Sequence, residues 1–237
     1  MIPKIIHYCW FGGKEIPGNL KKCMDTWKKY CPDYQIKLWN ESNFDVFSHP
    51  FIKAAYESKA WAFVSDYARL KIIFDQGGIY LDTDVELVKS LDSLLTNKCY
   101  IGIEQNGNRC NTGLGFGAEK QSDVVKRMLD VYGKVSFDNE KRIDIECPKL
   151  NTEAIRSIGE FSLCEVSFLP GVTVYPSQYM DPISTGITKN LLCEETISIH
   201  LYSASWTGGK ERLKRRVVAF IGAQRYYKIK RLLGRTI

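Results

Sequence analysis

Two aspartates with one residue between them, Asp82 and Asp84, are the side chains in this sequence that most clearly suggest chemistry. If the segment is extended, residues i and i+2 point to the same side, so both carboxylates can face one ligand. Adjacent carboxylates repel each other unless a cation or a proton lies with them. A divalent metal that prefers oxygen ligands, Mg²⁺ or Mn²⁺, satisfies both and keeps coordination positions free for phosphate oxygens. For an isolated pair, a solvated turn is the alternative interpretation.

A helix, a glycine turn and a strand are predicted to hold this pair in place. Apolar residues recur at helical spacing over residues 62–74, and two consecutive glycines then end the helix. Residues 79–81 form a short apolar strand that leads directly into the aspartates. Asp66 and Arg69 lie at i and i+3 and therefore share one face of the helix. If the helix packs beside the strand, Asp66 and Arg69 lie near the same crevice as the two aspartates. The alternative is that they form an ion pair on the surface.

This stretch resembles the DXD-motif glycosyltransferases of family 32, a group that includes capsular polysaccharide and yeast mannosyl transferases. It is also similar to the glucosyltransferase domain of the large clostridial toxins. The family pattern reads approximately S-D-x-x-R, a helix, and G-G-x-Y-x-D-x-D. Eight residues match it in order: Ser65, Asp66, Arg69, Gly77, Gly78, Tyr80, Asp82 and Asp84. The resemblance covers about residues 2–95 and 197–209, and it implies transfer of a hexose from a nucleotide sugar with retention of anomeric configuration.

An apolar, β-prone run over residues 2–11 is predicted to be the first buried strand, and it ends in an aromatic and glycine segment. In open α/β sheets, ligands bind at the carboxyl ends of the strands, where this segment lies. The run HYCWFGG is similar to the N-terminal element of the family, in which the tryptophan stacks on the nucleotide base. The resemblance therefore implies base stacking for Trp10, for which a core position is the alternative. For His7 we expect a structural role beneath the site.

The segment that starts at His200 reads H-x-x-x-x-S-W and is similar to the C-terminal motif of the family. In the family and in related metal-dependent transferases, the histidine or a neighbouring oxygen ligand completes the metal shell. The Ser-Trp pair, here Ser205 and Trp206, closes over the diphosphate. The clostridial toxins use a carboxylate and a serine instead, so a purely structural His200 at a strand end is the alternative.

The resemblance thus implies a set of site residues with distinct roles. The catalytic residues are Asp66, Arg69, Asp82 and Asp84. The metal ligands for Mn²⁺ or Mg²⁺ are Asp84, His200 and, directly or through water, Asp82. The donor-binding residues are Trp10, Phe11, Gly12, Ser65, Asp66, Arg69, Tyr80, Asp82, Thr83, Asn111, Ser205 and Trp206. Asn111 lies in a predicted polar loop over residues 105–113, where it reaches the donor sugar or the acceptor, or is simply a turn residue.

One α/β domain followed by a basic tail is the expected organisation. A chain of 237 residues with 44% apolar and 25% charged residues can build a sizeable core. A predicted strand, helix and strand open the chain, which suggests a βαβ unit. The resemblance implies the GT-A fold, a mixed, mostly parallel sheet between helices. We expect this domain over residues 1–209 and a basic, amphipathic, helical tail over residues 210–237.

The tail contains ten Lys and Arg residues and one acidic residue, whereas the whole chain carries a net charge of +6. Such a segment can bind an anionic membrane surface or be a solvated face, and no nucleic-acid-binding motif accompanies it. The N-terminus lacks a signal-peptide pattern, and the eight scattered cysteines include no CxxC pair. We therefore expect reduced thiols and a cytoplasmic protein, with peripheral attachment to the inner face of the membrane through the tail.

The expected function is that of a metal-dependent, retaining glycosyltransferase in surface or capsular polysaccharide synthesis. A UDP-sugar is the donor that the family favours over a GDP-sugar, and the acceptor is a glycan or a lipid-linked glycan. No residue stands out as a covalent nucleophile, so a front-face mechanism is expected, in which the departing phosphate helps to deprotonate the acceptor. The alternatives are a non-catalytic nucleotide-sugar or glycan-binding protein on the same fold and a protein-modifying, toxin-like glucosyltransferase. A haloacid-dehalogenase-type phosphatase would need Thr or Val where this chain has Glu86.

Overall fold

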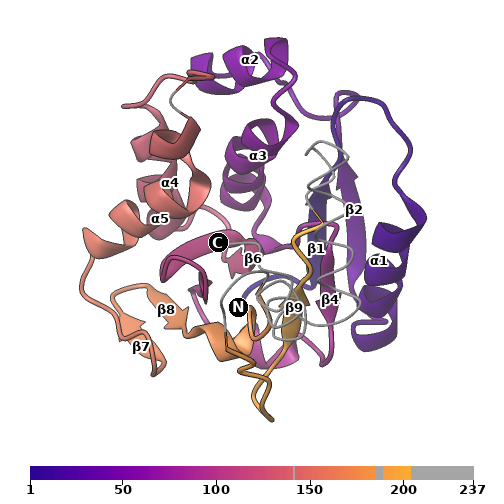
Figure 1. Cartoon of the computed structure of the whole chain (residues 1–237), viewed down its shortest axis with the longest axis vertical. Helices are drawn as coiled ribbons and strands as arrows, with labels where there is room; N and C mark the ends of the chain where they lie inside the picture. The colour runs from indigo at the N-terminus through magenta and orange to yellow at the C-terminus, as the bar shows by residue number, and fades with distance from the viewer. Residues whose placement is uncertain (141, 185–188, 204–237) are drawn as a thin grey trace, which may run out of the picture.

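A computed structural model describes residues 1–140, 142–184 and 189–203 of the chain, and it shows sheets with helices on both sides (Figure 1). The helices, 3₁₀ helices (η) and strands are, in chain order, β1 (Ile5–Cys9), α1 (Gly18–Tyr30), β2 (Gln35–Trp39), α2 (Pro50–Glu57), α3 (Trp61–Gln76), β3 (Gly78–Tyr80), β4 (Val85–Leu87), η1 (Asp92–Leu94), β5 (Cys99–Glu104), β6 (Arg109–Ala118), α4 (Asp123–Tyr132), η2 (Arg142–Ile145), α5 (Cys147–Arg156), β7 (Ser167–Leu169), β8 (Val172–Tyr175), η3 (Ser177–Tyr179) and β9 (Ser198–His200).

The main sheet has seven strands in the order β2-β1-β3-β6-β5-β8-β7. Five of them, β2, β1, β3, β5 and β8, run in one direction, whereas β6 and β7 run in the other. The predicted mixed, mostly parallel sheet is therefore confirmed. Because β1 pairs in parallel with β3, with His7 opposite Tyr80, the aromatic segment after β1 and the aspartates after β3 leave the sheet at the same edge.

Helices cover the two faces of the main sheet unequally. Helices α2, α3, α4 and α5 contribute to one large hydrophobic cluster, while α1, β4 and η1 contribute to a second (Figure 1). Helix α3 is buried on several sides, so its 16 residues show little amphipathic asymmetry. The helix that carries Asp66 and Arg69 is thus a central element of the fold, as the apolar run over residues 62–74 predicted.

A second, two-stranded sheet, formed by β4 and β9, was not expected. The strand that ends at His200 was expected and is β9, but three residues in each strand are too few for a pattern to reveal that β9 pairs with β4. Their antiparallel register places Val85 opposite His200. The segment before β4 is a turn rather than extended backbone, because the N–H of Val85 donates to the carbonyl oxygen of Asp82 at 3.0 Å. The assumption of an extended Asp-x-Asp segment was therefore wrong.

Strand β6 begins at Arg109, so Asn111 lies inside a strand and not in the last turn of a loop. Residues 105–108 do form the connection between β5 and β6, but the expected loop was wrong for residues 109–113, because polar residues normally depleted from strands occupy this one. Their polar atoms are satisfied within the structure: Asn111 is buried, and its amide is hydrogen-bonded to Glu104 and to the backbone of Gly113. Among the described residues, no helix has both the length and the apolar character needed to cross a membrane.

Candidate active site

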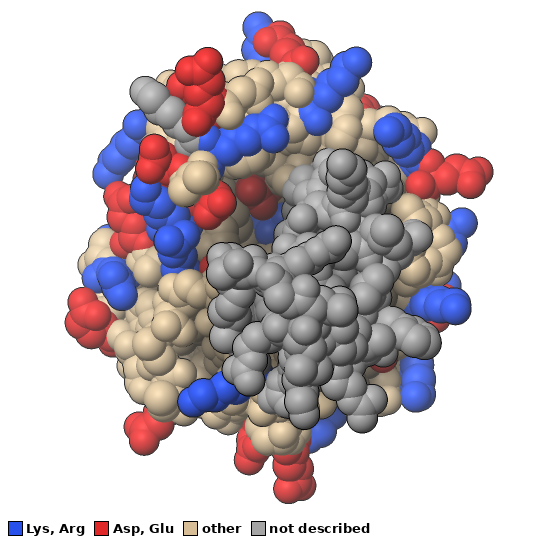
Figure 2. All heavy atoms as spheres, viewed as in Figure 1, with Lys and Arg blue, Asp and Glu red and all other residues tan. Residues whose placement is uncertain are grey.

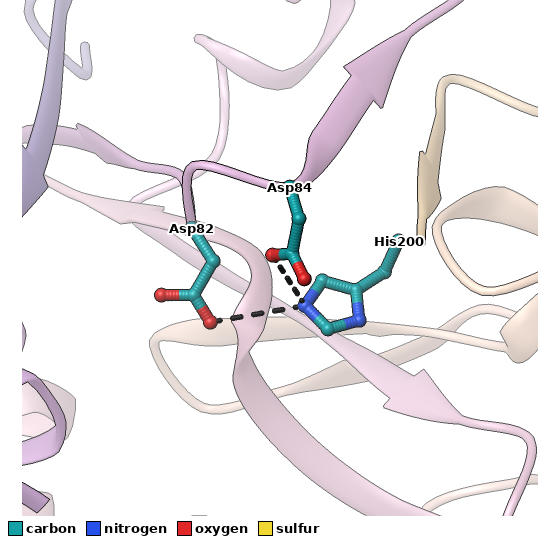
Figure 3. A group of neighbouring side chains, drawn as sticks. All are labelled: Asp82, Asp84 and His200. Carbon is teal, nitrogen blue, oxygen red and sulfur yellow. Dashed lines mark ion pairs between the residues drawn. The ribbon is translucent and has the colours of Figure 1, made fainter. Parts of the chain in front are cut away.

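Asp82, Asp84 and His200 meet where β3 gives way to β4 and where β9 ends (Figure 3). One ligand atom from each residue lies within 4.8 Å of the other two. Nε2 of His200 is 3.2 Å from Oδ1 of Asp84 and 3.8 Å from Oδ2 of Asp82. The β4–β9 register explains this proximity, since Asp84 directly precedes the residue paired with His200. The three predicted metal ligands therefore converge in space.

The charges in this cluster are strongly coupled. Burial alone would lower the pKa of His200, but the nearby charges of Asp84 and Asp82 raise it to about 10. For Asp84, burial alone would raise the pKa, but the nearby charge of His200 and the hydrogen bond from the backbone N–H of Ser203 lower it overall. Both ring nitrogens of His200 are buried and neither makes a hydrogen bond. Two carboxylates and an imidazole whose nitrogen faces them form a donor set that can hold a divalent cation.

Arg69 connects the helix to the aspartates. Its Nη2 lies 3.0 Å from Oδ1 of Asp66 and 3.0 Å from Oδ1 of Asp82, and its Nε donates to the carbonyl oxygen of Ser65 at 3.2 Å. The guanidinium lies 4.8 Å from the ring centre of Tyr80, whose hydroxyl donates to Asp82 at 3.0 Å. Because the Arg69 side chain is 5% exposed, the surface ion pair is excluded and the helix face lines the crevice.

Asp66 has a pKa raised to about 7, because burial and the charge of Asp82 outweigh the opposing charge of Arg69. The pKa of Asp66 is 3.8 in the unfolded chain and about 7 in the folded protein, so the folded protein binds the proton more tightly. The free energy of unfolding therefore falls as the pH rises from about 4 to about 7. Asp66→Asn has no carboxyl group at this position and should not show this loss. Relative to wild type, its free energy of unfolding should rise by on the order of 2 kcal/mol when the pH is changed from about 5 to about 8.

The measurement is the free energy of unfolding at several pH values, without metal or donor. Asp75→Asn is the matched control, because Asp75 lies on the same helix in an exposed ion pair with Lys71. Parallel stability profiles for wild type and Asp66→Asn would contradict the raised pKa of Asp66.

The opposite side of the cluster is formed by β6 and the end of β5. Nδ2 of Asn111 donates to Oε2 of Glu104 at 2.8 Å, and the N–H of Gly113 donates to Oδ1 of Asn111 at 2.7 Å. A Cβ atom added at Gly113 would lie 2.5 Å from Oδ2 of Asp82 and 3.1 Å from Nη1 of Arg69. Position 113 must therefore lack a side chain for the Asp82 carboxylate to keep its place.

Gly113→Ala should displace the Asp82 carboxylate from Arg69 and from its place beside Asp84 and His200. We expect the affinity for Mn²⁺ and the catalytic efficiency each to fall by about tenfold or more, the range found when a partner that orients metal ligands is lost. Gly18→Ala is the control, because a Cβ there meets no atom within 4 Å. Unchanged Mn²⁺ affinity in Gly113→Ala would mean that Asp82 tolerates the shift.

The segment after β1 borders a cavity of about 700 Å³ lined by Gly12, Gly13, Lys14, Glu41, Tyr56, Lys59 and Trp61. Trp10 is half-buried, and its indole donates to the carbonyl oxygen of Lys14 at 2.5 Å. Gly12 has a φ of 91°, and its N–H donates to Glu41 at 2.7 Å. A Cβ at Gly12 would lie 2.8 Å from the ring of Trp61, so the backbone approaches this indole closely.

Sequence reasoning missed Trp61 and Glu41 at this cavity. Trp61 begins α3, four residues before Ser65, and the i, i+4 spacing of a helix could have revealed it. Glu41 follows β2 and carries no sequence signal of its own. Phe11 is buried and packs edge-on against Phe44, so its ring belongs to the core.

His7 lies beneath the site, as expected. Its Nδ1 accepts a hydrogen bond from the indole of Trp39 at 3.0 Å, so Nε2 carries the proton that bonds the carbonyl oxygen of Gly77 at 3.0 Å. Burial lowers the pKa of His7 to about 4, so the ring is neutral and structural. Thr83 is buried in the turn between the aspartates, whereas Ser205 and Trp206 lie outside the described residues.

On the face of the molecule seen in Figure 2, acidic and basic side chains are interspersed. A hollow near the centre of this face has both acidic and basic side chains on its floor. Within the described part of this face, the basic side chains form no continuous patch (Figure 2). The mixed charge suits a polar ligand bound in the hollow more than a nucleic-acid backbone along the surface.

Residues 17–101 match the family described as "Glycosyltransferase sugar-binding region containing DXD motif". The chain is 33% identical over 123 residues to inositol phosphoceramide mannosyltransferase 3 of Schizosaccharomyces pombe. The aligned region covers 48% of this chain and 33% of the relative. It is 34% identical over 101 residues to the uncharacterized glycosyltransferase L373 of Acanthamoeba polyphaga mimivirus, and this aligned region covers 40% of each chain. The chain thus spans only about two fifths or less of the length of these curated relatives.

The solved structure of the PaToxG glycosyltransferase has the same fold, with a TM-score of 0.53, 23% identity and coverage of 66% of this chain and 69% of that one. The predicted GT-A fold is therefore confirmed. The matched region of the sequence contains Asp66, Arg69, Asp82 and Asp84, so the resemblance to DXD-motif glycosyltransferases is also confirmed for this part of the chain.

Proposed function

We propose that this chain, whose residues 17–101 match a DXD-containing glycosyltransferase region, transfers a hexose from a nucleotide sugar with the help of a divalent metal. The observation that carries the proposal is the convergence of Asp82, Asp84 and His200 beside the buried Arg69–Asp66 pair. The arrangement is that of a cation site next to carboxylates that can bind hydroxyl groups.

Each side chain then has a defined task. Asp66 accepts hydrogen bonds from hydroxyls of the donor sugar. Arg69 fixes the Asp66 and Asp82 carboxylates through its Nη2, and only its Nη1 is left to donate to a phosphate oxygen. Trp10 stacks on the base, and the Gly12 backbone and the cavity beside it receive the nucleoside. Asn111 turns toward the sugar from β6, with its amide orientation set by Glu104.

Asp84, His200 and Asp82 would hold a Mn²⁺ or Mg²⁺ ion, which would supply Lewis-acid stabilisation of the negative charge that builds as a nucleoside diphosphate departs. No residue stands out in the sequence as a covalent nucleophile. This supports transfer with retention by a front-face mechanism, in which the departing phosphate helps to deprotonate the acceptor hydroxyl.

The finer assignments concern donor, acceptor and place. A UDP-sugar is the proposed donor, and the acceptor is a glycan or a lipid-linked glycan of a surface or capsular polysaccharide. A relative named for mannosyl transfer to inositol phosphoceramide, a lipid, supports a lipid-linked acceptor. The basic residues 210–237, which lie outside the described part of the structure, would then hold the enzyme at the cytoplasmic face of a membrane.

Donor turnover tests the proposal against a purely binding protein. The purified chain is incubated with a panel of UDP- and GDP-sugars, with Mn²⁺ or with EDTA, and the released nucleoside diphosphate is measured. We expect slow release from one donor that stops when EDTA is added. Binding of a nucleotide sugar without release, even with glycan acceptors present, would favour the non-catalytic alternative, and no binding at all would remove the transferase assignment.

A further inference from the structure

His200 has one ring nitrogen whose partner the cluster does not provide. Nε2 faces Asp84 and Asp82, and Nδ1 lies on the opposite side of the ring (Figure 3). Both nitrogens are buried, and neither makes a hydrogen bond. A histidine that binds a metal through Nε2 carries its proton on Nδ1, and that N–H nearly always donates to a carboxylate, a carbonyl or a water. An acceptor for Nδ1–H is therefore needed.

Asp181 is a fully buried carboxylate with one oxygen left over. Its Oδ2 accepts from the N–H of Gln105 at 2.7 Å and from the hydroxyl of Tyr202 at 2.7 Å. Its Oδ1 is buried without a hydrogen-bond partner. Leaving a buried carboxylate oxygen unpaired costs free energy, so a residue retained in this state usually has a partner in the functional form of the protein.

Tyr202 links the two orphaned groups physically. Its ring packs edge-on against the imidazole of His200, with the ring centres 4.1 Å apart, while its hydroxyl bonds Asp181. The charge of His200 also acts to lower the pKa of Asp181, against the larger opposing effect of burial, as expected of groups that lie close together. An imidazole donor and a carboxylate acceptor thus contact the same tyrosine.

The other buried acceptors without partners in the described structure lie elsewhere. Tyr100 packs on Tyr175, and Tyr132 packs on Phe51 and Tyr67. The amide of Asn151 belongs to the group around Cys147 and Thr112. Asp181 is the one member of this set that shares a contact residue with His200.

We propose that Asp181 is a positioning residue for His200, and that its Oδ1 accepts the hydrogen bond of Nδ1–H through one bridging water. A water is needed because the two atoms are not in direct hydrogen-bond contact, and a buried polar site with two unpaired groups is where such waters are held. This inference rests on the proposed function, since it requires a metal on Nε2. The bond would fix the tautomer and the orientation of the imidazole before the metal arrives.

The test measures the Kd of the full chain for Mn²⁺ by electron paramagnetic resonance, with no donor or acceptor present. We expect Asp181→Ala to raise the Kd by about 10- to 100-fold, the range found for partners that orient metal-binding histidines. Asp181→Asn should cost less than about tenfold, because an amide oxygen still accepts the bond. Asp92→Ala is the matched control: this carboxylate also accepts a hydrogen bond from a tyrosine hydroxyl, that of Tyr34 at 2.9 Å, but it lies in η1 and its ion-pair partner is Lys4.

A double-variant cycle separates positioning from a general effect on the fold. If Asp181 acts through His200, Asp181→Ala adds no further loss of Mn²⁺ affinity in a His200→Ala background. Additive losses, or a Kd unchanged in Asp181→Ala, would overturn the inference. Should Asp181→Ala not fold, as judged by thermal unfolding with EDTA, the same cycle with Asp181→Asn decides.

Two results separate this inference from the proposed function. A wild-type chain that binds no Mn²⁺ would remove the metal site itself. Wild-type affinity in His200→Ala would overturn the link between Asp181 and His200, yet leave a metal site on Asp82 and Asp84.

Discussion

Asp84→Asn should lose about 1,000-fold or more in turnover, which corresponds to about 4 kcal/mol of transition-state stabilisation. The substitution removes a negative charge that faces His200 at 3.2 Å and that would bind the metal directly. A neutral amide oxygen is a much weaker ligand for a hard divalent cation than a carboxylate. The affinity for Mn²⁺ should therefore fall together with the rate.

The fold should survive this change. The backbone N–H of Ser203 donates to Oδ2 of Asp84 at 2.7 Å, and an asparagine oxygen can accept the same bond. Asp130→Asn, which changes an exposed ion pair with Lys126, is the control with an equal change of charge. Turnover by Asp84→Asn at the wild-type rate, measured as nucleoside diphosphate release, would remove the metal from the mechanism.

Arg69→Met should destabilise the protein by about 3–5 kcal/mol, because it leaves Asp66 and Asp82 without their buried counter-charge. Arg69→Lys restores the charge but not the planar fork that bonds two carboxylates at once, so we expect intermediate stability and a loss of about 100-fold in turnover. Unfolding in urea and nucleoside diphosphate release measure the two effects separately.

The control for Arg69 is Arg109→Met, which breaks an exposed contact of 3.5 Å with Glu146 and should cost at most about 1 kcal/mol. Adding Asp66→Asn to Arg69→Met should recover part of the lost stability, since one unpaired buried charge is then removed. An Arg69→Met protein as stable as wild type would show that the Arg69 network does not hold the site together.

The centre of the site could be predicted because its signals are local. Helix α3, the glycines after it and β3 occupy one continuous stretch, and helical spacing alone places Asp66 and Arg69 on one face. Two alternatives stayed open in the sequence, a solvated turn and a surface ion pair. Burial of Arg69 against Asp66 and Asp82 decides both, and only three-dimensional packing could show it.

The rest of the site depends on contacts between distant segments. Strand β9 lies more than a hundred residues after β4, and two three-residue strands carry no pattern that reveals their pairing. The same holds for Asp181 and Glu104, which are ordinary acidic residues in the sequence and become notable only through burial. The position of Asn111 was misjudged because its polar neighbours are typical of a loop, whereas hydrogen bonds satisfy them within a strand.

The location of the metal tests the central claim most directly. Crystals of the chain grown with Mn²⁺ and a nucleoside diphosphate would reveal the ion by its anomalous scattering. We predict one Mn²⁺ bound by Asp84 and His200, with diphosphate oxygens in its remaining positions and the base against Trp10. An ion bound elsewhere, or a nucleotide bound away from the Asp82–Asp84 turn, would contradict the assignment of this cluster as the active site.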